Sequence, residues 1–216
     1  MENKPNPAWF RGLRSYGVTR RGFGVVSSLS NSTYLKWAAL GGFVGAILMG
    51  LVMMGGTASM GLGFTAMMCA MAIAILGLNP AGGMATTIPG LMLHLIDGII
   101  IGLIVVAITL GVKRKLLITN TKNGLAIGLL AGFVVWLVFG LPILLFAMPP
   151  AMAQVAGMMM PMKAGMTMAQ ADAEAMMMLQ GMMGQLAGLF LVGHLFWGAA
   201  LGTLVGFGVS RHGGSK

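Results

Sequence analysis

The chain has 216 residues, of which 57% are hydrophobic and 8% charged, and its mean hydropathy is +0.91. A soluble domain of this length needs far more polar surface, so the composition excludes an ordinary soluble protein and predicts an integral membrane protein. The formal net charge of +9 does not indicate nucleic-acid binding, because the basic residues flank apolar segments and no RNA-binding or zinc-finger pattern occurs. The single cysteine, Cys69, excludes an intrachain disulfide.

A polar, basic arm, residues 1–35, precedes the first apolar segment. It is too polar to insert into a bilayer, and its arginines suit a membrane surface rich in anionic head groups. We therefore expect the arm to lie on the cytoplasmic face of the membrane or on a partner protein. The arginines concerned are Arg11, Arg14, Arg20 and Arg21.

Five apolar segments follow the arm, and the distribution of charge predicts that four of them span the membrane. The segments are 37–54, 58–78, 90–112, 124–147 and 184–208. If 58–78 does not cross, then 12 of the 13 basic residues lie on one side of the membrane, with Lys163 as the exception. A fifth span would move the basic connection 113–123, which includes Lys113, Arg114 and Lys115, to the opposite side. Because basic residues favour the cytoplasmic side, we expect four spans with both termini, including the tail 209–216, in the cytoplasm of a prokaryote.

Two segments then lie on the outer side, 55–89 and 148–183. The first is too apolar for an ordinary loop, so we expect a re-entrant or interfacial helix covered by protein. The second holds 13 of the 23 methionines. We expect Pro149 and Pro150 to end the third span, and the helix-forming residues 166–183 to run continuously into the fourth.

The four predicted spans contain an internal sequence repeat. The stretch ALGGFVGAILMGL (39–51) matches AIGLLAGFVVWLV (126–138) at an offset of 87, and HLIDGIIIG (94–102) matches HLFWGAALG (194–202) at an offset of 100. This pattern predicts a tandem duplication of a helical hairpin, with repeats 36–112 and 124–208 and an insertion of 13 residues in the second outer segment. The two halves run in the same direction, so a pseudo-twofold axis is expected along the membrane normal.

Each histidine stretch places one histidine and two glycines on one helical face, because positions i, i+4 and i+8 lie above one another. Glycines at this spacing let two membrane helices approach closely. The pattern predicts that the second and fourth spans pack near the axis, with both histidines facing protein, and that glycines of the first and third spans close the bundle. The predicted packing glycines are Gly98 and Gly102, Gly198 and Gly202, Gly41 and Gly45, and Gly128 and Gly132.

The paired histidines, His94 and His194, leave three interpretations open. They could form interhelical hydrogen bonds, ligate a haem b axially, or bind copper. Asp97, one turn from His94, could orient its imidazole or relay a proton. The outer methionines also allow two interpretations. Thioethers select Cu(I), but methionine also suits adaptable protein interfaces. The methionines weighed for this metal role are Met158, Met159, Met160 and Met162.

No pattern of catalytic residues is present, so the sequence does not predict an enzyme or assign a cofactor. The favoured function is a non-catalytic accessory subunit of a larger membrane complex, for example a respiratory or other energy-transducing one, which docks on other membrane subunits within the lipid bilayer. The first alternative is a copper- or haem-binding membrane protein. The second is a small proton-linked transporter that uses Asp97.

Overall fold

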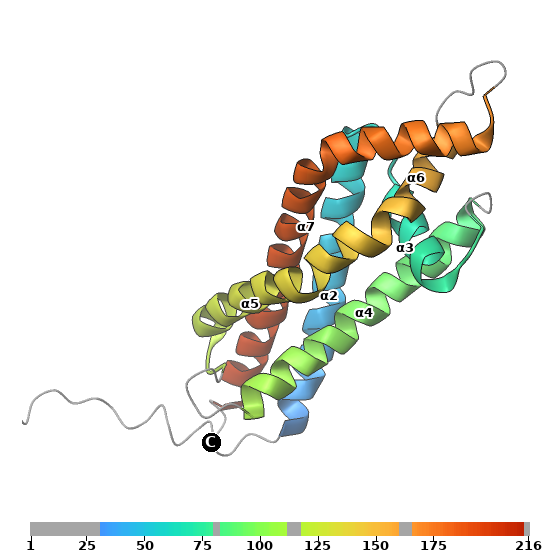
Figure 1. Cartoon of the computed structure of the whole chain (residues 1–216). Helices are drawn as coiled ribbons and strands as arrows, with labels where there is room; N and C mark the ends of the chain where they lie inside the picture. The colour runs from blue at the N-terminus through green and yellow to red at the C-terminus, as the bar shows by residue number, and fades with distance from the viewer. Residues whose placement is uncertain (1–30, 80–82, 112–117, 160–165, 214–216) are drawn as a thin grey trace, which may run out of the picture.

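The computed structural model describes residues 31–79, 83–111, 118–159 and 166–213, and all of its secondary structure there is helical (Figure 1). The predicted surface residues of the basic arm and of the connection, from Arg11 to Arg21 and from Lys113 to Lys115, therefore lie outside the described residues. The helices are α2 (Asn31–Ser59), α3 (Ala66–Leu76), α4 (Met84–Gly111), α5 (Thr121–Val135), the π-helices η3 (Trp136–Gly140) and η4 (Ile143–Ala147), α6 (Met148–Met159) and α7 (Met168–Gly213).

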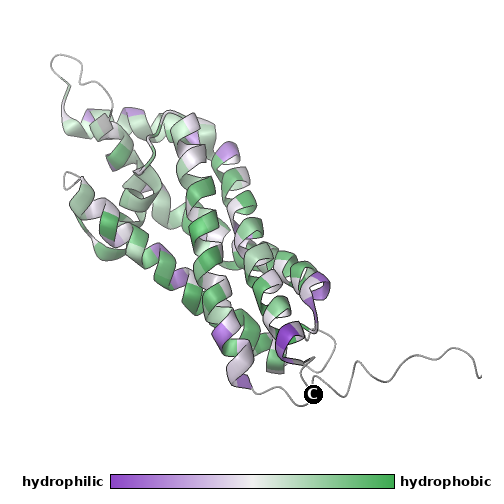
Figure 2. Cartoon of the chain, turned by 180° about the vertical axis from the view of Figure 1, so that it is seen from behind, coloured by the Kyte–Doolittle hydropathy of each residue, from purple (hydrophilic) through white to green (hydrophobic). Residues whose placement is uncertain are grey.

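Four helices of the described chain are long and apolar enough to cross a membrane, as predicted: α2, α4, the helix from Thr121 to Met158 and α7. Figure 2 shows hydrophobic residues along these helices and most of the strongly hydrophilic ones near their ends. The apolar segment 58–78 forms the 11-residue helix α3, which is only about 16 Å long at 1.5 Å per residue and cannot span a hydrocarbon core of about 30 Å. It follows a turn with positive φ at Gly61 and Gly63, and ends at Gly77 in the left-handed conformation.

The third long helix differs from the expectation, because it does not end at Pro149 and Pro150. It continues from Thr121 to Met158 through η3 and η4 into α6. Both prolines lie at the start of α6, directly after η4. The backbone N–H of Met148 bonds to the carbonyl of Ile143, five residues back, so a π turn precedes the prolines instead of a helix end.

The expected continuation of the outer segment into the fourth span is confirmed, since α7 runs without interruption over 46 residues. At about 1.5 Å per residue, it is more than twice as long as the hydrocarbon core is thick. The N-terminal part of α7 packs on α6, as at Gly157, which lies against Ala171 and Asp172, and α3 packs on both α4 and α6. The start of α2, the end of α4, the start of α5 and the end of α7 all lie at the opposite end of the bundle (Figure 1).

The long helices pack in the order α4, α2, α7, α5, each against the next. The expected close packing of the second span on the fourth is wrong, because α4 and α7 are not a close backbone pair. They meet through the side chains of Trp197 and Leu201, which lie near Gly98 and Gly102. The central contact is instead between α2 and α7, where Gly41 packs on Leu201 and Gly45 on Trp197.

Each glycine stripe packs on the first helix of its own hairpin. Gly98 lies against Gly42 and Ala46, and Gly102 lies against Ala38 and Gly42. This arrangement lets the backbones of α4 and α2 touch where no side chain intervenes.

The second hairpin has the corresponding contacts between α7 and α5. Gly198 lies against Gly128 and Gly132, and Gly202 lies against Gly124 and Gly128. The contacting positions of α2 and α5 are thus 86 residues apart, one fewer than the offset of 87 in the sequence match, whereas those of α4 and α7 are 100 apart. Gly41 and Gly45 each come one residue before a position of α2 that meets α4, namely Gly42 and Ala46. They therefore lie on a neighbouring face of α2, and this face contacts α7.

Candidate functional site

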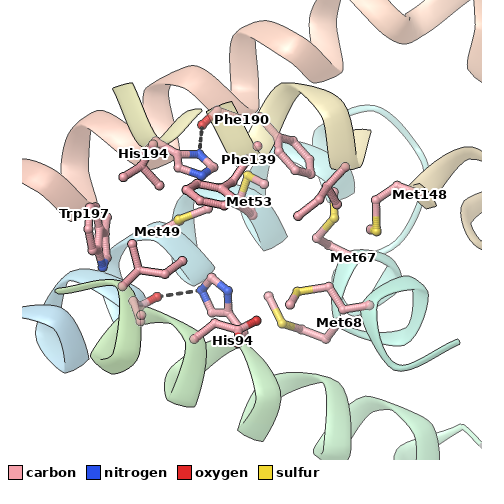
Figure 3. A pocket seen from close by; sticks show the side chains of 18 of the residues that line it. Met49, Met53, Met67, Met68, His94, Phe139, Met148, Phe190, His194 and Trp197 are labelled. Atoms are coloured by element: carbon pink, nitrogen blue, oxygen red, sulfur yellow. Dashed lines mark hydrogen bonds between the residues drawn. The ribbon is translucent and has the colours of Figure 1, made fainter. Parts of the chain in front are cut away.

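A cavity of about 120 Å³ lies among the helices, lined by residues of all four long helices and of α3 (Figure 3). Its position follows from the packing order. In the described chain α2 packs on α7, but α4 and α5 are not a packed pair, and the cavity is lined from both sides of this gap. Gly98 of α4 and Gly140 of η3 mark the two sides, while α3 and α6 contribute Met68 and Met148.

His94 lines this cavity from α4, with its side chain only 7% exposed. It lies 10 residues from the N-terminal end of α4, which is about 15 Å along the helix axis and places it in the interior of this 28-residue helix. The Nε2–H group of its ring donates a hydrogen bond of 2.9 Å to the carbonyl of Ala46 on α2. Gly50, one turn further along α2, leaves room for the ring, since a Cβ there would lie 3.4 Å from Nε2.

His194 lines the same cavity from α7 and is equally buried, at 7% exposed. Its Nδ1–H group donates a hydrogen bond of 2.7 Å to the carbonyl of Phe190, one turn earlier in the same helix. Gly140, at the end of η3, faces the other side of the ring, because a Cβ there would lie 2.8 Å from Cε1 and 3.0 Å from Nε2. The π turn thus brings a residue without a side chain against the second ring nitrogen.

These hydrogen bonds define the free nitrogen of each imidazole. A backbone carbonyl only accepts, so the bonded nitrogen carries the proton, and in the neutral ring the other nitrogen keeps a lone pair. The lone pairs are therefore on Nδ1 of His94 and on Nε2 of His194. Figure 3 shows the two rings on facing sides of the cavity, with methionine side chains around them.

Six methionines line the cavity together with the histidines. They come from three separate elements: Met49 and Met53 from α2, Met67, Met68 and Met71 from α3, and Met148 from α6. No sequence pattern predicts a metal role for these six residues. Their helical spacing was visible, since 49 and 53 are one turn apart and 67, 68 and 71 share one side of a helix, but spacing within one helix does not show which helix lies opposite.

The outer methionines for which the sequence suggests a metal role lie elsewhere. Met158, near the end of α6, is 41% exposed and does not line the cavity. The side chain of Met159 and the residues Met160 and Met162 lie outside the described part of the chain. The structure thus brings the two predicted histidines together with a different group of thioethers.

Two further polar groups face the cavity, Asp97 and Trp197, which occupy equivalent positions in the two histidine stretches. Trp197 is 2% exposed, and its indole Nε1–H has no hydrogen-bond partner among the described residues. Asp97 is half-buried and contributes the only carboxyl group among the residues that line the cavity. Cys69 is not part of this site, since its Sγ lies 3.0 Å from Oγ1 of Thr87 in the packing between α3 and α4.

The side chains that line the cavity provide donor atoms that can bind a ligand. In the described chain no three His, Cys, Asp or Glu side chains cluster as a metal site of hard or borderline type. The cavity instead combines two imidazoles with soft thioethers in apolar surroundings. Comparison with known protein families, with curated proteins and with solved structures finds no match to this chain, so its function has to be inferred from this geometry.

Proposed function

We propose that this protein is a non-catalytic subunit of a larger membrane assembly and that it docks on a partner helix through α7. The observation that carries the proposal is a row of exposed glycines on that helix. Gly181, Gly184 and Gly188 lie on one face, and a Cβ added at any of them would meet nothing within 4 Å.

These glycines contrast with those in the helix interfaces. At Gly98, Gly128 and Gly202, a Cβ would collide with the neighbouring helix, so each of them has a packing role inside the chain. A glycine in the middle of a helix lowers its stability by roughly 1 kcal/mol relative to alanine. Three such glycines at helical spacing with no neighbour in this chain are therefore best explained by a partner helix that approaches closely.

The rest of the same face supports this interpretation. Further along α7, its lipid-facing positions carry the bulky side chains of Val192 and Phe196, which cover the backbone. On the other side of the glycine row, Met177 is 65% exposed, the adaptable type of side chain that suits a protein interface. The face thus changes from large to small residues where we place the partner.

We also propose that the two hairpins arose by tandem duplication and that both termini are cytoplasmic. The duplication is supported by matching contacts, because Gly42 and Ala46 meet Gly98 as Gly128 and Gly132 meet Gly198. The orientation is supported by the charge distribution of the sequence and by the four helix ends that lie at one end of the bundle.

The test is gentle detergent extraction of the tagged full chain from its native membrane, followed by native electrophoresis and mass spectrometry. We expect the wild-type chain to migrate with other polypeptides in fixed stoichiometry. The double variant Gly184→Leu/Gly188→Leu places two side chains in the contact and should release the chain from the assembly.

The matched control is Val192→Leu/Phe196→Leu on the same helix, which keeps bulky side chains on the lipid-facing positions and should leave the assembly intact. The proposal is contradicted if the wild-type chain is extracted alone, if the assembly contains copies of this chain alone, or if the glycine variant stays fully associated.

A further inference from the structure

The cavity between α4 and η3 joins donor groups from five helices. Two imidazoles face it from α4 and α7, and six thioethers face it from α2, α3 and α6. We infer that this cavity is a binding site for a single Cu(I) ion, held by Nδ1 of His94 and Nε2 of His194 together with thioether sulfur from the surrounding methionines. The inference does not depend on the partner proposed above, because all of these groups belong to this chain.

The imidazoles are already arranged as ligands. A metal-bound histidine usually donates its other ring N–H to a carbonyl or carboxylate, which fixes the tautomer and the ring orientation. His94 does so to Ala46 and His194 does so to Phe190. The nitrogen that remains in each ring is a free base, and the two rings face the same cavity. These hydrogen bonds, which join two helices for His94 and lie within α7 for His194, use one nitrogen of each ring and leave the other nitrogen without a partner among the described residues.

The thioethers determine which metal fits. Thioether sulfur is a soft, uncharged donor that favours Cu(I), whereas Zn²⁺ prefers thiolate, imidazole and carboxylate, and Mg²⁺ and Ca²⁺ prefer oxygen. Met53, Met67, Met68 and Met148 are all nearly fully buried, at 2% exposed or less, so their sulfur atoms are held in place by packing. Met68 and His94 both lie against Gly50 of α2. A Cβ added at Gly50 would be 3.9 Å from Cε of Met68 and 3.4 Å from Nε2 of His94.

The charge of the site also suits a monovalent cation. Neutral imidazoles and thioethers carry no charge, so a bound Cu(I) adds one positive charge in an apolar environment, which is unfavourable without compensation. Asp97 faces the same cavity and, as a carboxylate, would leave the occupied site without net charge. A divalent ion would keep one uncompensated charge at this depth.

The experiment uses the full chain in detergent, kept anaerobic with ascorbate, and titrates it with Cu(I) against a chromophoric Cu(I) chelator. We expect one Cu(I) per chain. X-ray absorption at the copper edge should show both imidazole nitrogen and sulfur as neighbours of the metal. This second measurement uses the wild-type chain, so it stays informative even if a variant fails to fold.

The variants remove one ligand at a time. We expect His94→Ala and His194→Ala each to weaken Cu(I) binding at least tenfold, since even the loss of a hydrogen bond that supports a metal ligand lowers affinity about 10- to 100-fold. The matched control is His212→Ala. His212 lies on the same helix as His194 and also bonds through Nδ1 to a carbonyl four residues back, that of Gly208, but it does not line the cavity.

Two further changes leave both histidines in place. Met53→Leu/Met68→Leu replaces two buried thioethers by apolar side chains of similar volume, which cores tolerate well, and should weaken binding. The matched control is Met177→Leu, at an exposed methionine outside the cavity. Gly140→Ala should also weaken binding, because its Cβ would crowd Nε2 of His194.

Several results would overturn the inference. These are no Cu(I) retained by the wild-type chain, unchanged affinity in both histidine variants, or copper neighbours that lack nitrogen or lack sulfur. A purified chain with a haem absorption band that disappears in His94→Ala or His194→Ala would also overturn it, because the imidazoles would then be axial ligands of an iron porphyrin. Loss of the partner assembly with intact Cu(I) binding would contradict the proposed function and leave this inference standing.

Discussion

The glycines in the long helices of this protein include two groups with opposite environments. Most meet the backbone of a neighbouring helix, as Gly128 meets Gly198 and Gly202, while a few face open space, as Gly181 does. The amino acid is the same, but its energetic role is opposite. In the first environment the missing side chain permits van der Waals contact between helices of this chain, and in the second it lowers the stability of its own helix in the isolated chain.

This difference predicts opposite effects of the same substitution. Gly128→Ala would place a Cβ against the carbonyl of Gly198 and 2.9 Å from Cα of Gly202, so we expect a loss of about 1–3 kcal/mol of stability. Gly181→Ala should raise the stability of the isolated chain by roughly 0.5–1 kcal/mol. Unfolding of the detergent-solubilised chain by a denaturing detergent, followed by circular dichroism, measures both changes. Equal effects of the two substitutions would refute the distinction.

The third long helix shows how a local change of helix type positions a functional group. A proline inside a helix removes one hydrogen bond and clashes with the carbonyl four residues earlier, so the chain needs a local rearrangement. Pro142 lies between η3 and η4, and the backbone N–H of Leu141 bonds to the carbonyl of Trp136, five residues back. The wider turn of η3 rotates the residues that precede it relative to α7. With this geometry, Gly140 faces His194.

We expect Pro142→Ala to shorten the π segment towards α-helical geometry and to rotate Gly140 away from His194. Cu(I) affinity in the chelator titration should then fall severalfold, although Pro142 does not line the cavity. The matched control is Pro89→Ala, at a proline inside α4 that also lies outside the cavity lining and should leave the affinity unchanged. If Pro142→Ala binds Cu(I) as the wild type does, the π segment does not position the site.

At the scale of the whole molecule, the packing order α4, α2, α7, α5 produces the cavity. If the hairpins are related by a twofold axis, the contact of α2 with α7 should have a counterpart between α5 and α4. That pair is not packed in the described chain, and the cavity lies in its place. The absence of this contact leaves a small interior space without disturbing the close glycine contacts inside each hairpin.

The orientation of the whole molecule gives a prediction that labelling can test. In a Cys69→Ala chain, single cysteines at Thr121 and Ser210 lie near the end of the bundle that we assign to the cytoplasm, and cysteines at Ser59 and Thr167 lie near the opposite end. A membrane-impermeant maleimide added to intact cells should label positions 59 and 167, and should label 121 and 210 only after the cells are opened. Labelling of Thr121→Cys in intact cells would reverse the orientation.

The sequence by itself determined the properties that depend on local composition. Hydropathy and the distribution of basic residues predicted four long apolar helices rather than five, because the insertion of a segment depends mainly on its own residues and its flanking charges. It also determined that glycines and a histidine share one face in α4 and again in α7, since that follows from helical periodicity alone.

Only the tertiary structure decided which face meets which helix. The glycines of α4 and α7 could pack on one another or on α2 and α5, and the choice depends on the combined shapes of all four helices, which no single segment contains. The same choice brought His94 and His194 to one cavity with methionines of α2, α3 and α6. Residues far apart in the chain become neighbours through packing, so the sequence contains the donor atoms and the fold decides which of them line one cavity.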